Sequence, residues 1–324
     1  MKRGLFILFI TSLLLSACGT TPSLWGIYAT PTVDPYAPIP VAVQKVNTPT
    51  VLPTPISEPV PATPTRIVTA TNTPVVALTQ ETSQQKATPF PTSSEPPILY
   101  YSQSGDTLDA VATHFGVETN EITSAQSLPQ KGLIDPGILL VIPERLTEYG
   151  PNAQIMPDSE IIFSVSATDF DIETYIKEAG GELSRYKEFL GSAGWTTGTQ
   201  AIERIVSENS VNPRLVLALL DYEGKWVSGS PPDYLHEKYP MGFERKYKEG
   251  VFIQTVLGVN ELFTGYYGWR SGKLTELTFP DGETLRIAPD LNAGTVAMQY
   301  FFSKLYNKPE WQSIIDPNVG FPAF

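Results

Sequence analysis

Cysteine and histidine are almost absent from this sequence: its 324 residues contain one Cys and two His. A single Cys excludes an internal disulfide and a zinc site built on thiolates. The residues after His236 do not complete the His-Glu-x-x-His pattern of a helical zinc-protease site. Lys and Arg number only 22 against 34 Asp and Glu, a net charge of −12. This balance argues against a nucleic-acid partner, because cations supply that affinity. We expect no metal and no cofactor.

The N-terminus has the pattern of a bacterial lipoprotein signal. A Met-Lys-Arg start is followed by an uncharged, mostly apolar run over residues 4–17, which is too short to span a bilayer stably. The Leu-Ser-Ala-Cys sequence that ends at Cys18 resembles the lipobox. The resemblance implies a signal peptide over residues 1–17 and lipidation of Cys18, which would anchor the protein to a bacterial membrane outside the cytoplasm. The alternative is an ordinary secretory signal with an incidental cysteine.

Residues 18–97 differ in composition from the rest of the chain. Of the 30 Pro in the sequence, 16 lie here, together with many Thr. Proline removes backbone donors, and the segment has few large apolar side chains to bury. It is therefore predicted to be a disordered linker, with its Thr-Pro repeats in polyproline II conformation.

Residues 98–145 have the signals of a small βααβ module. Apolar residues over 98–101 and 138–143 predict two strands. Over residues 108–115 the apolar positions recur at i, i+3, i+4 and i+7, which predicts a helix, and residues 118–125 offer a second one.

Three blocks of this module, residues 100–108, 112–117 and 136–143, resemble the LysM domain. The resemblance implies binding of N-acetylglucosamine-containing glycans such as peptidoglycan or chitin. It places the sugar between two loops, at Gly105, Asp106, Thr107, Leu133, Ile134 and Asp135. The alternative is that these residues only shape the fold. His114 is expected to be a partly exposed helix residue, since no second ligand lies near it in the sequence.

Residues 146–324 have the pattern of a mainly α domain with one β-hairpin. Apolar periodicity predicts helices over residues 172–179, 182–190, 199–207, 213–223 and 291–305. A Pro-Asp-Gly turn at 280–282 predicts the hairpin. Trp311 is expected to pack after the last helix.

The helix that ends near Glu223 has the clearest chemistry. Asn212 can serve as its N-cap, Pro213 suits its first position, and Gly224 can serve as its C-cap. Burial, the helix C-terminus and the neighbouring Asp221 all favour the protonated form of Glu223 and should raise its pKa. A carboxyl with a raised pKa suits a general acid that can also act as a base.

Residues 211–226 resemble the catalytic helix of soluble lytic transglycosylases and goose-type lysozymes, and residues 292–300 resemble a later helix of that family. The resemblance implies a lysozyme-like fold with Glu223 as the single catalytic acid/base. Aromatic residues near it in sequence suit a glycan groove: Tyr222, Trp226, Tyr266, Tyr267 and Trp269. The alternative is that most of them belong to the core.

Three functional hypotheses follow. The first is a membrane-anchored, peptidoglycan-binding lipoprotein that cleaves the glycan strand as a lytic transglycosylase or muramidase. The second is a non-catalytic wall-binding lipoprotein whose lysozyme-like domain is a binding scaffold, for which Glu223 would be dispensable. The third is a peptidase; a serine nucleophile is not excluded, but nothing in the sequence resembles one. No oligomeric state is predicted.

Overall fold

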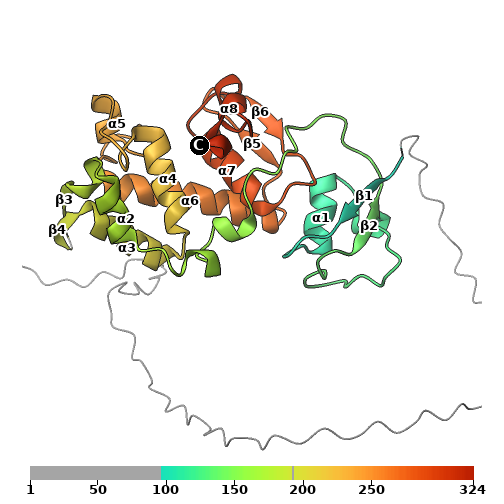
Figure 1. Ribbon diagram of the computed structural model, residues 1–324. Coiled ribbons are helices and arrows are strands. Elements are labelled where there is room, and N and C mark those ends of the chain that lie inside the picture. The colour runs from blue at the N-terminus through green and yellow to red at the C-terminus, as the bar shows by residue number, and fades with distance from the viewer. Residues whose placement is uncertain (1–95, 192) are drawn as a thin grey trace, which may run out of the picture. The chain divides into compact units, whose positions relative to one another are not determined.

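A computed structural model describes residues 96–191 and 193–324 of the chain (Figure 1). The predictions for the signal peptide, Cys18 and almost all of the Pro-rich linker lie outside the described residues. Within these two ranges, no helix combines the length and the hydropathy that a membrane span requires.

The small module consists of one two-stranded sheet and one helix. Strands β1 (Ile98–Tyr101) and β2 (Leu139–Ile142) pair antiparallel, with Ile98 opposite Ile142. Helix α1 (Leu108–Phe115) buries its apolar residues against them, as the periodicity predicted.

The predicted second helix of this module, over residues 118–125, is wrong. Only a single 3-10 turn forms there, at Thr119–Glu121. Thr123 instead exchanges two backbone hydrogen bonds with Val141 of β2. This pairing holds the chain in an extended conformation, which excludes a helix.

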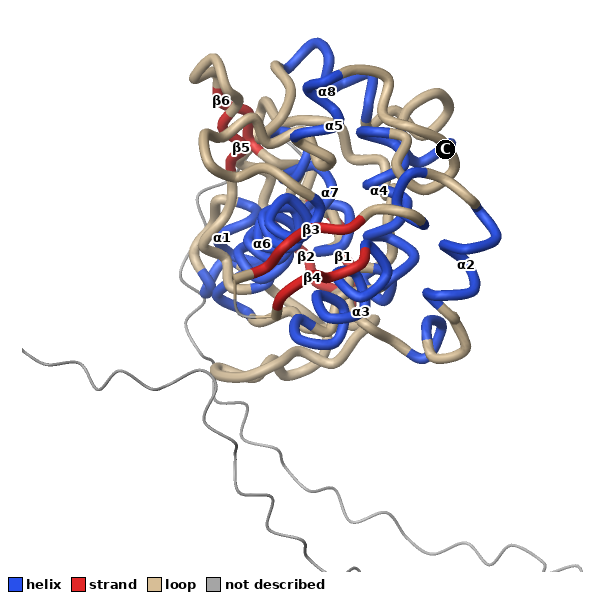
Figure 2. Tube along the Cα trace, turned by 90° about the vertical axis from the view of Figure 1, so that its left-hand side faces the viewer, coloured by secondary structure: helices blue, strands red, loops and turns tan. Residues whose placement is uncertain are grey.

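The large domain is mostly helical. Its helices are α2 (Ile172–Ala179), α3 (Gly198–Asn209), α4 (Pro213–Gly224), α5 (Tyr234–Lys238), α6 (Val251–Arg270), α7 (Ala293–Ser303) and α8 (Lys308–Ile314). Two antiparallel hairpins accompany them, where the sequence predicted one: β3 (Lys187–Leu190) with β4 (Gly194–Thr197), and the predicted hairpin of β5 (Glu276–Thr278) with β6 (Thr284–Arg286). Helix α6 contacts α3, α4 and α7 and so forms the centre of this domain (Figure 2). Trp311 is fully buried, as predicted.

The helix predicted over residues 182–190 is also wrong. After a 3-10 turn at Glu182–Ser184 the chain enters β3, where Phe189 stands opposite Trp195 of β4. Aromatic cross-strand pairs favour strands, and Gly194, with a φ of 76°, occupies a conformation that glycine tolerates.

Helix α6 was not predicted, because its three glycines lower helix propensity. Two of them allow close packing. A Cβ at Gly265 would lie 2.8 Å from the Cα of Ala297 in α7, and one at Gly258 would lie 3.2 Å from the ring of Phe301. Tertiary packing, rather than local preference, therefore places this helix.

Candidate buried-acid site

Helix α4 begins as its sequence predicts. The side chain of Asn212 accepts a hydrogen bond from the backbone N–H of Arg214 at 3.0 Å, and its amide donates to Glu160 at 2.8 Å. Pro213 occupies the first helical position. Because most of the following residues are apolar and buried, the helix passes through the core of the domain.

The end of α4 differs from the prediction. Gly224 is the last helical residue, and Lys225 is the C-cap, in a left-handed conformation with a φ of 52°. The close approach of Trp226 explains why glycine precedes the cap: a Cβ on Gly224 would lie 2.7 Å from the Cδ1 atom of that indole. Trp226 is itself buried, and its Nε1 donates to the carbonyl of His236 at 2.9 Å.

Glu223 lies in the last turn of α4 and is buried. The hydroxyl of Tyr306, beyond the end of α7, donates a hydrogen bond to Glu223 Oε2 at 2.7 Å. Gly242 lies against the same oxygen, since a Cβ there would be 3.2 Å from it. Glu223 Oε1 is buried and has no hydrogen-bond partner among the described residues. The site is thus a carboxyl with one oxygen held by a phenol and one oxygen unsatisfied.

The environment of Glu223 raises its pKa toward neutrality. Burial raises its pKa to about 7, although the hydrogen bond from Tyr306 and the nearby His236 act in the opposite direction. Burial was one of the predicted causes. Asp221, another predicted cause, is not among the groups that shift this pKa; its carboxylate accepts hydrogen bonds from the backbone N–H groups of Val227 and Ser228. With a pKa near 7, the carboxyl can both hold and release a proton.

The aromatic residues predicted to line a glycan groove do not form an open surface together. Trp226, Tyr266 and Trp269 are buried in the core. Tyr222 is half-buried and packs edge-on against Phe302 and Phe321, among other rings. Of the five, only Tyr267 exposes about half of its side chain. The alternative prediction, that these aromatic residues belong to the core, therefore holds for Trp226, Tyr266 and Trp269.

The two loops predicted to bind sugar in the small module lie side by side. Thr107 forms an isolated antiparallel bridge with Leu133, and the N–H of Ile134 donates to the carbonyl of Asp106. Leu133, Ile134 and Asp135 border a cavity of about 310 Å³, and Leu133 is strongly exposed. Ile134 is buried, while Thr107 caps α1 by accepting from the N–H of Ala110.

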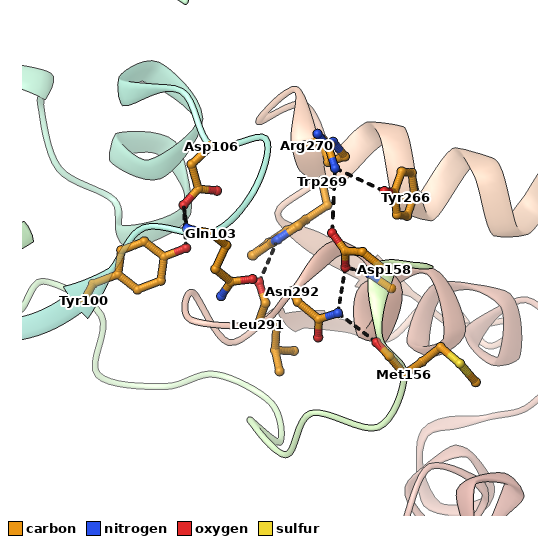
Figure 3. A network of polar contacts seen from close by, with 11 residues as sticks. Tyr100, Gln103, Asp106, Met156, Asp158, Tyr266, Trp269, Arg270, Leu291 and Asn292 are labelled. Atoms are coloured by element: carbon orange, nitrogen blue, oxygen red, sulfur yellow. Dashed lines mark hydrogen bonds and ion pairs between the residues drawn. The ribbon is translucent and has the colours of Figure 1, made fainter. Parts of the chain in front are cut away.

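Gly105 and Asp106 contact other residues of the chain. A Cβ on Gly105 would overlap the guanidinium of Arg270, so the arginine would have to move to admit a larger residue. The carboxylate of Asp106 accepts from the hydroxyl of Tyr100 and from the N–H of Gln103, each at 2.7 Å (Figure 3). Burial raises the pKa of Asp106.

His114 is buried rather than partly exposed, which corrects the prediction. Its ring stacks on Trp269, with centroids 3.6 Å apart, and its Nε2 lies 2.9 Å from the carbonyl oxygen of that residue. Burial lowers the pKa of His114 to about 4. Arg286 donates to the carbonyls of Thr113 and His114 at the end of α1. No local pattern indicates these contacts, because 155 residues separate the two rings.

A polar network around Asp158 was also missed. Asp158 accepts hydrogen bonds from the side chain of Asn292 and the N–H of Gly294, each at 2.7 Å, and lies 3.7 Å from the guanidinium of Arg270 (Figure 3). Arg270 also donates to the hydroxyl of Tyr266. The described residues contain no group of three His, Cys, Asp or Glu side chains able to hold a metal ion.

A family profile described as the LasA N-terminal domain matches residues 154–321, more than half of the chain. The chain therefore belongs to the LasA N-terminal domain family, which is named after a staphylolysin-like peptidase. No curated protein and no solved structure matches the chain.

This membership corrects the functional predictions. The chain is not assigned to the lytic transglycosylases or muramidases, and the binding-only scaffold is overturned with them. The LysM and lysozyme-like resemblances find no support in the comparison. The reason lies in the motif: an Asn cap, a first-turn Pro, an apolar run and a terminal acid build any buried capped helix. Such a pattern does not define one family.

Proposed function

We propose that this protein is a peptidase-type enzyme of the bacterial cell envelope that cleaves the peptide part of peptidoglycan. Membership of the LasA N-terminal domain family is the observation on which the proposal depends, since LasA is a staphylolysin-like peptidase. The peptidase hypothesis, ranked last from the sequence, thus becomes the first. The lipobox-like sequence at Cys18 supports a location at the outer side of a bacterial membrane.

Glu223 is the residue to which we assign proton transfer. Hydrolysis of an amide needs a group that takes a proton from the attacking water and a group that gives one to the leaving nitrogen. A carboxyl with a pKa of about 7 is suited to both steps at neutral pH. In this assignment Tyr306 holds Oε2, and Oε1, which has no partner among the described residues, is the oxygen that accepts the proton.

The proposal is tested by digesting purified peptidoglycan with the mature chain, carrying Cys18→Ala to remove the lipid. Mass spectrometry of the released fragments should show new amino termini from cut peptide bonds. Glu223→Gln should lower the rate of their appearance by about a hundredfold or more, within the range of general acid–base catalysis. Glu244→Gln, the same change at an exposed glutamate, should leave the rate unchanged.

Each other outcome has a clear meaning. Absence of new amino termini with the unmodified chain would overturn the peptidase proposal. New termini at the same rate with Glu223→Gln would leave the peptidase in place and remove Glu223 from its mechanism.

A further inference from the structure

A cavity of about 620 Å³ lies on the side of α4 that carries Arg214 and Asp221. Its walls come from residues 155–160, from α2 and the residues before it, from α4 and from residues 321–324. Most of the lining is apolar, with aromatic rings such as Phe170, Tyr175 and Phe324, and the last two expose about half or more of their side chains. Cavities of this size and composition are typical of small-ligand sites.

Arg214, the second residue of α4, provides a positive charge at this cavity. Its guanidinium carbon lies 5.2 Å from the centre of the Phe170 ring, a geometry that orients the group. None of the ion pairs among the described residues involves Arg214. Glu160 also lines the cavity, but its two oxygens already accept hydrogen bonds from Asn212 and Ser166. An oriented guanidinium without a carboxylate partner is a receptor for a carboxylate.

Asp221 provides an acceptor at the other end. It lies seven residues after Arg214, hence on the same face of α4 and about 10.5 Å along the axis. Its Oδ1 accepts from the N–H groups of Val227 and Ser228, which fixes the carboxylate. Its Oδ2 has no hydrogen bond within the described residues and is available to an N–H donor. A cation and an acceptor therefore flank the apolar lining.

The axial distance between these two backbone positions on α4 is comparable to the length of a short peptide. An extended chain advances about 3.3 Å per residue, so about three residues span 10.5 Å. We propose that this cavity binds a short apolar peptide, with the terminal carboxylate on Arg214, an N–H on Asp221 and apolar side chains against the aromatic walls. This goes beyond the proposed function, because the cavity does not contain Glu223.

Isothermal titration calorimetry of the mature Cys18→Ala chain tests the proposal. The probes are the tripeptide Leu-Phe-Leu with a free carboxylate, the same tripeptide as its C-terminal amide, and decanoate. The acid should bind about tenfold more tightly than the amide, since charge-assisted hydrogen bonds are lost in the amide. Decanoate should bind more weakly than the acid because it offers no N–H to Asp221.

Variants locate the interaction. Arg214→Met keeps an apolar stem over Phe170 and should make acid and amide bind equally. Arg185→Met, an exposed arginine outside the cavity lining, should change nothing. The proposal would be overturned if the tripeptide did not bind, if the acid and the amide bound equally to the unmodified chain, or if Arg214→Met had no effect. If decanoate bound as tightly as the tripeptide, the assignment of a peptide as the ligand would be overturned. Binding is measured without cleavage, so the result does not depend on peptidase activity.

Discussion

Glu223 should make the stability of the protein fall as the pH rises, and replacing it with Gln should remove that dependence. Burial raises the pKa of Glu223 from 4.5 to about 7 in the folded chain. Between these values the native protein keeps a proton that the unfolded chain has lost. The stabilisation is therefore complete below the unfolded pKa and is lost as the pH passes the folded pKa.

The magnitude follows from the difference between the two pKa values. A difference of one in pKa corresponds to about 1.4 kcal/mol. The unfolded carboxyl is already partly ionised at pH 5, so the native state loses about 2–3 kcal/mol of stability through this group between pH 5 and pH 8. Glu223→Gln keeps an oxygen that can accept from Tyr306 and does not titrate. Any cost of its amide group is the same at both pH values and cancels in the comparison.

Urea unfolding at pH 5 and pH 8 measures this effect. The unfolding free energy of the Glu223→Gln variant, relative to the unmodified chain, should increase by about 2–3 kcal/mol from pH 5 to pH 8. Glu244→Gln, at an exposed position, should show no such change. Equal pH dependence in the unmodified chain and in Glu223→Gln would refute the assignment of a buried, proton-holding carboxyl.

Three further predictions concern the surroundings of this site and the buried histidine. Tyr306→Phe removes a hydrogen bond that lowers the pKa of Glu223, so carbon-13 NMR titration of that carboxyl should give a higher pKa, and an unchanged value would contradict the contact. Gly224→Ala should destabilise the fold by about 1–3 kcal/mol in thermal unfolding, because the added Cβ would overlap the buried Trp226. A gain in stability would mean that the indole of Trp226 can move away from the added Cβ without cost. The pKa of His114 falls from 6.5 to about 4 on folding. The stability that the neutral imidazole contributes is therefore complete above pH 6.5 and is lost as the pH falls toward 4. In urea unfolding, His114→Gln should lack this loss of stability at acid pH, and an identical loss in both proteins would contradict the prediction.

Local signals made parts of the fold predictable from the sequence. The cap formed by Asn212, the first-turn Pro213 and the apolar run define α4 through interactions between neighbours in the chain. The burial of Glu223 follows from the same pattern. In the small module, the spacing of apolar residues was sufficient for α1.

Contacts between distant segments were not predictable. Tyr306 is 83 residues from Glu223, and no local signal marks it as the partner of that carboxyl. Helix α6 forms in spite of its glycines because close packing against α7 outweighs their helix propensity. The strand at Lys187–Leu190 has local composition compatible with a helix, and its pairing with β4 decides the outcome.

The family was missed for a physical reason as well. The pattern that suggested a transglycosylase describes how a helix is capped and buried, and a terminal glutamate fits many such helices. The chemistry of the site depends on what surrounds the carboxyl. In this chain Tyr306, Gly242 and the unsatisfied Oε1 define that environment, and none of them appears in the motif.

Digestion of peptidoglycan in oxygen-18 water by the mature Cys18→Ala chain identifies the bond that the protein hydrolyses. Hydrolysis of a peptide bond places one oxygen from water in the new carboxylate, so we expect peptide fragments that carry one oxygen-18 atom at a new carboxyl terminus. Glycan ends should remain unlabelled. Label in the glycan ends alone, or no label in any fragment, would contradict the assignment of this protein as a peptidase of the cell wall.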